Sequence, residues 1–213
     1  MEKEWLIGSE TAVYQDAVHR FTEDSLALVR FLQLHSGDRM LDLGTGNGIL
    51  AIYGQALYGG RWTGIDLDET ALELARRAAA ENGQSMEFHR MDVAQAPDLL
   101  GHGNFDGIVC NPPYFTTGTQ GARALMRHGT DALLSDWCRA AFLLLNNGGR
   151  MTLCYPADRL AVLFRALDQA RLAPKRMLLL HTEDRARLAL VEAKKLGGDG
   201  MEITSVCNFF THS

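Results

Sequence analysis

Apolar residues along the chain follow two alternating spacings. Short, mostly apolar runs lie at 39–43, 62–65, 86–90, 105–110 and 150–155, and they predict five strands. Segments with apolar residues three and four positions apart lie between most of these runs, which is the spacing of helices that bury one face. Strands alternating with helices are typical of an α/β doubly wound, Rossmann-like fold whose sheet is parallel.

The first predicted helix has a recognisable start. Thr22 is followed by Glu23 and Asp24, so the helix would receive an N-cap oxygen and negative charge in its first turn. The residues His35-Ser36-Gly37 would end it. Further helices are predicted at 49–58, 69–82, 133–144 and 160–167, and Asn147-Gly148-Gly149 would end the one at 133–144.

The last two predicted strands are Met177–His181 and Ala186–Ala193, and only the turn Thr182–Arg185 separates them. A parallel crossover needs a dozen or more residues, so these strands must be antiparallel neighbours and give the sheet an antiparallel last strand. No repeat or linker interrupts the chain. We therefore expect one domain over residues 1–213, in which residues 1–35 form an N-terminal segment that contacts the substrate and closes over the cofactor.

Composition narrows the class of protein. The chain of 213 residues is 46% hydrophobic and 22% charged, as in globular proteins. It has no run of 18 apolar residues and no secretory signal, so we expect a cytoplasmic protein without a membrane partner. Cys110, Cys138, Cys154 and Cys207 form no close pair, and the seven histidines show no metal-ligand spacing. We expect free, mostly buried thiols and no metal.

The net charge of −5 is unevenly distributed. Residues 1–122 carry a balance of −9, whereas residues 123–213 carry +4. An acidic whole chain argues against a dedicated nucleic-acid coat protein, but a local basic face on the C-terminal half remains compatible with RNA.

A glycine-rich loop, Asp42-Leu43-Gly44-Thr45-Gly46-Asn47-Gly48, follows the first predicted strand and opens a helix. Glycines let the backbone approach a ligand, and the helix N-terminus offers free N–H groups to a carboxylate or phosphate. The spacing is GxGxG and not the GxGxxG of nicotinamide folds. Asp42, two residues before Gly44, is placed to meet the ammonium of an amino-acid moiety.

Two more aspartates end the next strands. Asp66 lies 22 residues beyond Gly44, where a carboxylate can accept both ribose hydroxyls. Asp92 is placed to bind the exocyclic amine of an adenine. Either aspartate alone is equally well explained as a cap of the following segment, but three at successive strand ends favour a nucleoside-containing cofactor.

The tetrad Asn111-Pro112-Pro113-Tyr114 directly follows the strand at 105–110. Two prolines fix an extended, rigid backbone. An adenine N6 or an amide nitrogen is a poor nucleophile, because its lone pair is delocalised. If the Asn111 side chain and the Pro112 carbonyl accept its two N–H groups, the lone pair turns toward a methyl donor. Tyr114 would stack on the flat group. The alternative is a proline-rich turn with a buried tyrosine.

With these motifs the chain resembles the class I S-adenosylmethionine-dependent methyltransferases that carry NPPY. It is most similar to the bacterial tRNA adenine-N6-methyltransferase family that modifies adenine 37 of a valine tRNA. The similarity extends from about Tyr14 to Ala193. The motifs that carry it are Phe21-Thr22-Glu23-Asp24-Ser25, DLGTGNGI at 42–49, NPPY at 111–114, Arg127-His128 and Ala173-Pro174-Lys175-Arg176.

The resemblance implies S-adenosylmethionine as cofactor, RNA (tRNA) as substrate, and a monomer or homodimer. Phe21 and Thr22 would close over the methionine end of the cofactor. Asn111, Pro112 and Tyr114 would hold the target base, with Asn111 also beside the cofactor. The other cofactor contacts implied are Asp42, Gly44, Gly46, Asp66 and Asp92.

Arg123, Arg127 and His128 lie just beyond the tetrad in a predicted loop, where basic groups would meet RNA phosphates. An ordinary solvated surface cluster explains them about as well. Relatives often have Arg-His-Glu where this chain has Arg127-His128-Gly129. This departure and the short, glycine-rich segment after Leu196 lie where we expect the substrate to be selected.

Two other functions remain open. A glutamine amide in a protein is also a planar nitrogen, and release-factor methyltransferases use NPPY for it. Those enzymes carry a larger N-terminal helical domain, whereas about 35 residues precede the first predicted strand here. A nicotinamide-dependent oxidoreductase, or a non-catalytic nucleotide-binding protein, is opposed by the loop spacing and by the tetrad.

Overall fold

The computed structural model describes residues 1–6, 9–112 and 120–206, and it gives only the backbone for residues 120–130. The strands are β1 (Glu2–Trp5), β2 (Ala12–Gln15), β3 (Arg39–Leu43), β4 (Arg61–Asp66), β5 (Glu87–Arg90), β6 (Phe105–Cys110), β7 (Leu145–Pro156), β8 (Leu172–Thr182), β9 (Arg185–Lys195) and β10 (Glu202–Val206). The helices are α1 (Glu23–Phe31), α2 (Ile49–Tyr58), α3 (Glu69–Glu81), α4 (Ala96–Leu100), α5 (Gln120–Leu144) and α6 (Leu160–Gln169), with a 3-10 turn η1 (Ala157–Arg159).

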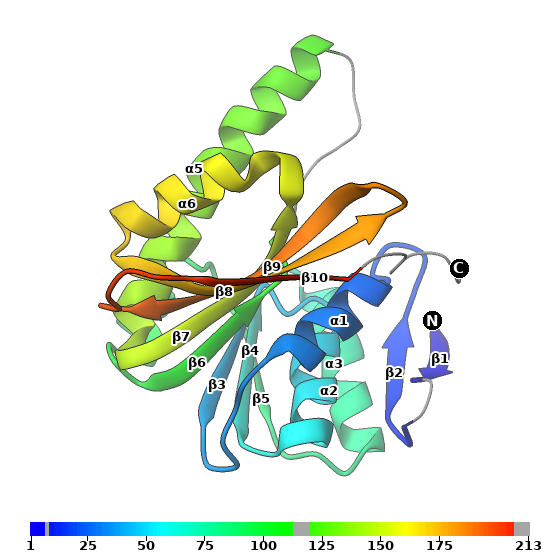
Figure 1. Ribbon diagram of the computed structural model, residues 1–213. Coiled ribbons are helices and arrows are strands. Elements are labelled where there is room, and N and C mark those ends of the chain that lie inside the picture. The colour runs from blue at the N-terminus through cyan, green and yellow to red at the C-terminus, as the bar shows by residue number, and fades with distance from the viewer. Residues whose placement is uncertain (7–8, 113–119, 207–213) are drawn as a thin grey trace.

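A central sheet of eight strands has the order β10-β8-β9-β7-β6-β3-β4-β5 (Figure 1). Strands β3 to β7 are all parallel, and β9 runs antiparallel to both β7 and β8. The doubly wound α/β fold predicted from the sequence is confirmed, and so is the antiparallel pair formed by β8 and β9. The chain does not end with this pair, because β10 adds a parallel edge strand beside β8.

Helices cover both faces of the sheet. Successive residues of a strand point to opposite faces, and on β3 Met40 packs with the core beneath α1, α2 and α3, whereas Leu41 packs with the core beneath α4, α5 and α6. Figure 1 shows the first turns of α5 extending past the edge of the sheet. The carboxyl ends of β3, β4, β5 and β6 therefore meet at one edge, between the two helical layers.

The sequence did not predict the hairpin of β1 and β2, which packs against α3. The side-chain amide of Asn82 closes this contact, because it accepts from the backbone N–H of Ala12 at 2.8 Å and donates to the carbonyl of Ala12 at 2.7 Å. All four residues of β1 are exposed and all four of β2 are buried, so neither strand shows the alternation that identifies a half-buried strand.

Two predictions around α5 were wrong. Arg123, Arg127 and His128 fall within this helix and not in a loop, because the run from Gln120 to Leu144 contains no proline and is rich in alanine and leucine. The predicted stop Asn147-Gly148-Gly149 lies inside β7, where the pairing with β6 shifts register between Leu145 and Arg150. These residues form an irregularity in the strand.

Other local predictions concern caps and thiols. Thr22 occupies the N-cap position of α1, as predicted, but its side chain makes no capping hydrogen bond. Cys110, Cys138 and Cys154 are buried, as predicted, and form no disulfide within the described ranges, whereas Cys207 lies outside them. No helix in the described ranges is long and apolar enough to span a membrane.

Candidate functional site

The glycine loop between β3 and α2 has the conformation that the sequence predicts. Gly44, Gly46 and Gly48 have φ values of +68°, +53° and +82°, which other residues rarely adopt. A Cβ at Gly44 would overlap the indole ring of Trp137, whereas a Cβ at Gly46 would meet no atom within 4 Å. Trp137 of α5 therefore supports the loop from below, and the space over Gly46 is open to a ligand.

Asp42 lies fully buried beneath this loop. Its Oδ2 accepts from the Thr45 hydroxyl at 2.6 Å and from the backbone N–H of Ala51 at 3.2 Å. Its Oδ1 is buried without a hydrogen-bond partner in the described chain. Burial raises the pKa of Asp42 to about 7, against the hydrogen bonds, which lower it. Asp42 does not line the cavity described below, and its contact with an ammonium group stays a prediction.

Asp66 is the last residue of β4, and Asp92 follows the end of β5, so both lie at the carboxyl ends of the strands. Asp66 accepts from the backbone N–H of Gly46 at 2.8 Å through Oδ2, and from that of Asp68 at 2.9 Å through Oδ1. Asp92 is exposed and accepts from the backbone N–H of Ala94 at 2.9 Å. Both carboxylates thus cap local turns, which is the alternative to a cofactor contact that the sequence left open. Asp66 also holds the glycine loop that would bind a cofactor.

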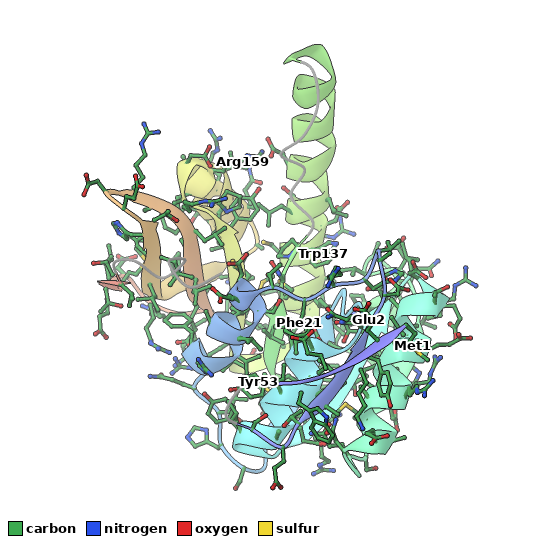
Figure 2. All side chains as sticks on the ribbon, turned by 90° about the vertical axis from the view of Figure 1, so that its right-hand side faces the viewer. Met1, Glu2, Phe21, Tyr53, Trp137 and Arg159 are labelled. Atoms are coloured by element: carbon green, nitrogen blue, oxygen red, sulfur yellow. The ribbon has the colours of Figure 1, made fainter. Side chains whose placement is uncertain are left out.

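A cavity of about 220 Å³ lies above the glycine loop. Gly44 and Gly46 line its floor, Asn111 lines one wall, and residues 18–21 close it from the side of β2. Phe21 is among these residues, and its closure over a cofactor stays a prediction. Thr22 instead lines a neighbouring cavity of about 340 Å³ that shares Phe21 with the first. Figure 2 shows Phe21 and Trp137 in the middle of the molecule, on the segments that enclose the loop.

Asn111 follows the last residue of β6 and reaches the cavity. Its Oδ1 is buried and accepts no hydrogen bond from the residues that the structure describes. Such an orphaned acceptor costs free energy unless a ligand group satisfies it. Pro112 is buried beside it, and Tyr114 lies outside the described residues. The side chains of Arg123, Arg127 and His128 are also outside the description.

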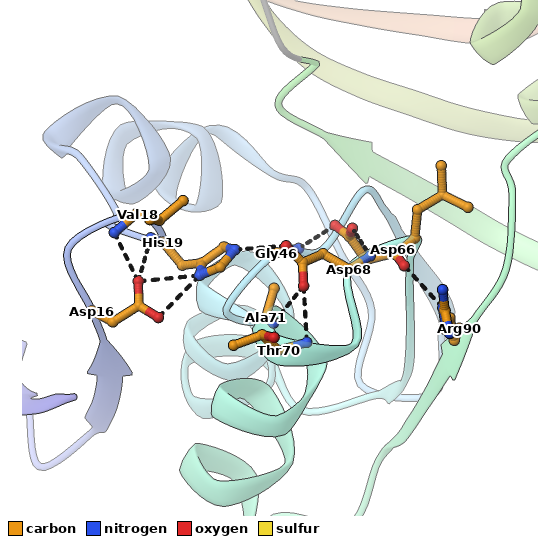
Figure 3. Close-up of polar contacts among 10 residues, drawn as sticks. Asp16, Val18, His19, Gly46, Asp66, Asp68, Thr70, Ala71 and Arg90 are labelled. Atoms are coloured by element: carbon orange, nitrogen blue, oxygen red, sulfur yellow. Dashed lines mark hydrogen bonds and ion pairs between the residues drawn. The ribbon is translucent and has the colours of Figure 1, made fainter.

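A histidine that the sequence did not single out also lines the cavity. His19 Nδ1 lies 3.1 Å from Asp16 Oδ1, and His19 Nε2 lies 3.0 Å from Asp68 Oδ2 (Figure 3). Asp68 is the N-cap of α3, since it accepts from the backbone N–H groups of Thr70 and Ala71. The sequence offered no signal for this contact, because His19 and Asp68 are 49 residues apart.

A larger cavity, of about 730 Å³, lies elsewhere. It is bounded by α6, the start of β8 and residues 196–201, at the opposite edge of the sheet from the glycine loop. None of the predicted site residues lines it. Within the described ranges no group of three or more histidine, cysteine or acidic side chains is arranged to hold a metal ion. The chemistry therefore concentrates at the smaller cavity.

The chain has the features of a Rossmann-like protein of the methyltransferase type: a doubly wound sheet, a GxGxG loop after β3, and an Asn-Pro sequence after β6. The family comparison agrees with this class. Residues 6–155 match the model of the methyltransferase small domain, and the chain belongs to that family.

Known proteins resemble the chain in sequence and in structure. A tRNA1(Val) (adenine(37)-N6)-methyltransferase of Vibrio vulnificus is 37% identical over 134 residues, which cover 59% of this chain and 54% of the relative. TrmN from Thermus thermophilus superimposes with a TM-score of 0.61 at 30% identity, covering 81% of this chain and 48% of that one. A predicted O-methyltransferase from Agrobacterium tumefaciens shares the fold, with a TM-score of 0.69, 23% identity, and 89% and 88% coverage. The chain spans about half the length of the Vibrio relative.

Proposed function

We propose that the chain transfers a methyl group from S-adenosylmethionine to the N6 amine of an adenine in tRNA. The observation that carries this proposal is Asn111. Its buried Oδ1 has no partner among the described residues, and it lies on the same cavity as the cofactor loop. An exocyclic amine that enters this cavity would supply the missing N–H.

The residues present fit the cofactor. The backbone at Gly44 and Gly46 approaches the cavity without side chains, and Asp66 stands at the strand end where a ribose is bound in such folds. The contact of Asp42 with an ammonium group stays a prediction, because its Oδ1 is fully buried beneath the loop and does not line the cavity. Asp92 would receive the adenine amine. When bound, S-adenosylmethionine supplies an electrophilic methyl carbon on a sulfonium.

The protein's part in the reaction is to orient the acceptor. Asn111 Oδ1 accepts one N–H of the amine, and the Pro112 carbonyl accepts the other. These two bonds direct the nitrogen lone pair at the methyl carbon. The two oxygens would also stabilise the positive charge that develops on the nitrogen when it receives the methyl group. The nitrogen would then release one proton to solvent. Stacking by Tyr114 stays a prediction, since the structure does not describe it.

The choice of tRNA rests on two supports. The Vibrio relative is named as a tRNA adenine-N6-methyltransferase, and residues 123–213 carry a net charge of +4. In the fold, the described part of this half of the chain forms α5, α6 and the four strands β10, β8, β9 and β7, which are adjacent in the sheet. We expect the RNA to approach across this half of the sheet, where its phosphates meet less negative charge.

The test is a transfer assay with purified protein, labelled S-adenosylmethionine and tRNA from cells that lack the protein. We expect label in tRNA, recovered as N6-methyladenosine, and a loss of at least about 100-fold in kcat for Asn111→Ala. The matched control is Asn147→Ala, which changes an asparagine in β7 at the opposite edge of the sheet. Label in a protein glutamine and none in tRNA would replace the RNA assignment with the amide alternative.

A further inference from the structure

His19 is held by carboxylates on both sides of its ring. Nδ1 lies 3.1 and 3.2 Å from the two oxygens of Asp16, and Nε2 lies 3.0 Å from Asp68 Oδ2. An ionised carboxylate only accepts hydrogen bonds, and a neutral imidazole carries only one N–H. Both contacts are therefore satisfied together only by the doubly protonated ring.

The contact joins two parts of the chain that enclose the cavity. Asp16 belongs to residues 16–21, the segment that leaves β2 and crosses to α1, which we call the strap. Asp68 belongs to the turn between β4 and α3. The backbone N–H groups of Val18 and His19 also donate to Asp16 Oδ1, at 2.8 and 2.7 Å, so the strap is folded around this carboxylate.

From Asp68 the hydrogen bonds continue to the cofactor loop. The Asp68 backbone N–H donates to Asp66 Oδ1, and Asp66 Oδ2 accepts from Gly46 (Figure 3). A chain of polar contacts thus runs from the strap, through His19, to the glycine that faces the open space of the cavity.

The strap limits access to the site. The cavity of about 220 Å³ is smaller than the roughly 300–1,000 Å³ of sites that hold molecules of cofactor size. Val18, His19, Arg20 and Phe21 all line it. The strap therefore has to move outward when a cofactor enters or leaves, and the described hydrogen bond that ties its side chains to α3 is the one between His19 and Asp68.

We propose that His19 is a positioning residue that fastens the strap across the cofactor cavity, so that cofactor exchange requires the His19–Asp68 contact to open. This proposal rests on the proposed function, which makes the cavity a cofactor site. Its consequence is that the cofactor leaves more slowly at low pH, where the ring is charged.

The titratable groups around His19 support this direction. Partial burial lowers the pKa of His19, but the bonds to Asp16 and Asp68 outweigh it and raise the pKa above its ordinary value. The carboxylate of Asp16 has its pKa lowered to about 2, first by the backbone N–H of His19. Asp68 also has a lowered pKa, through the bond to His19. Arg20 is exposed and makes no described ion pair.

Two substitutions of His19 separate its two contacts. The amide of His19→Asn reaches only as far as Nδ1, so it keeps the bond to Asp16 and loses Asp68. The amide of His19→Gln reaches as far as Nε2 and keeps Asp68. A third variant, Asp68→Asn, retains an oxygen for the N-cap of α3 and removes the charge that faces His19. The matched control is His35→Gln, since His35 faces Asp38 at 3.6 Å and is 93% exposed, away from the cavity.

The first measurement is the dissociation rate of S-adenosylhomocysteine between pH 6 and pH 8. We expect His19→Asn and Asp68→Asn to release it about 5- to 10-fold faster than the wild type at pH 6, a modest factor because Asp68 is half exposed. The double variant should be no faster than either single one. His19→Gln keeps the bond to Asp68, so its dissociation rate at pH 6 should be closer to that of the wild type. Because its amide does not titrate, this rate should not change between pH 6 and pH 8. Wild-type rates in His19→Asn, or an unchanged pH profile in His19→Gln, would overturn the proposal.

The second measurement needs no ligand. Backbone amide exchange at Val18 and His19 should be faster in Asp68→Asn than in the wild type, with β3 and β4 unchanged. A wild type that binds no S-adenosylhomocysteine would remove the proposed function and this proposal together. If the wild type binds S-adenosylhomocysteine, but the variants show unaltered amide exchange and unaltered ligand release, only the proposed role of the His19–Asp68 contact is contradicted.

Discussion

The backbone N–H of Gly46 donates a 2.8 Å hydrogen bond to the carboxylate of Asp66, which ends the neighbouring strand twenty residues later. This bond couples the two motifs that the cofactor needs. The tip of the glycine loop is therefore held by the side chain that we propose accepts the ribose hydroxyls of the cofactor. Under this proposal, one carboxylate both fixes the loop and binds the ligand.

Asp66→Asn should weaken cofactor binding more than it weakens the fold. Its uncharged amide can still accept from Gly46, but it binds ribose hydroxyls less well than a carboxylate does. Because hydrogen bonds to charged groups contribute about 1.5–3 kcal/mol, we expect the Kd for S-adenosylhomocysteine to rise about 10- to 100-fold. Calorimetric titration measures this. Asp199→Asn, in the loop after β9, is the control and should bind as the wild type does; equal Kd values for the two variants would contradict the role of Asp66.

Alanine at the two glycines should give opposite outcomes. Gly44→Ala adds a Cβ at φ +68° that overlaps Trp137, so it should destabilise the fold by about 2–4 kcal/mol. Gly46→Ala meets only backbone strain at φ +53°, about 1 kcal/mol, but its Cβ enters the open space over the loop. Denaturant unfolding and S-adenosylhomocysteine binding, measured on both, should separate them. A Gly46→Ala variant that binds normally would mean that the cofactor does not pass over this residue.

Asp42 should make stability depend on pH in a defined window. Burial raises its folded pKa from 3.8 to about 7. A raised pKa means that the folded state holds its proton more tightly, so this contribution is complete below pH 3.8 and is lost as the pH rises to about 7. Asp42→Asn can keep both bonds of Oδ2 and carries no charge. Its unfolding midpoint should exceed that of the wild type by at least about 3 °C at pH 8, with the difference vanishing toward pH 4. The same variant should bind S-adenosylhomocysteine less tightly if Asp42 meets the ammonium group.

Removing the indole of Trp137 should weaken cofactor binding, because this ring supports the glycine loop at Gly44. Trp137 is 6% exposed and lies against Gly44. Trp137→Ala should cost about 3–5 kcal/mol of stability, as large-to-small core changes do. Trp137→Phe retains part of the contact and should fold, with a larger Kd for S-adenosylhomocysteine and a smaller change in kcat. A Trp137→Phe variant with wild-type Kd would show that the loop keeps its shape without this support.

Apolar spacing predicted the strands and helices that lie in the middle of the fold, because these elements bury one or both faces. It missed β1 and β10, in which every residue is exposed, and so neither has an alternating pattern. It also placed a stop where Gly148 and Gly149 instead form an irregular stretch of β7.

The residues of the site also fall into those that the sequence predicted and those that it did not. Gly44, Gly46 and Asn111 lie on one cavity as their motifs indicated, since a motif next to a strand end fixes where its residues lie. His19 was not predictable from its neighbours, because its partner Asp68 reaches it only through the packing of the strap on α3. Contacts that depend on tertiary packing leave no local pattern in the sequence.

Nucleoside mass spectrometry tests most directly whether this chain methylates adenine N6 in tRNA, as we propose. Transfer RNA would be digested from cells that lack the protein, and from the same cells supplied with the wild type or with Asn111→Ala. We predict that N6-methyladenosine falls on deletion and returns with the wild type only. An unchanged amount of N6-methyladenosine in tRNA after deletion would contradict the proposed methylation.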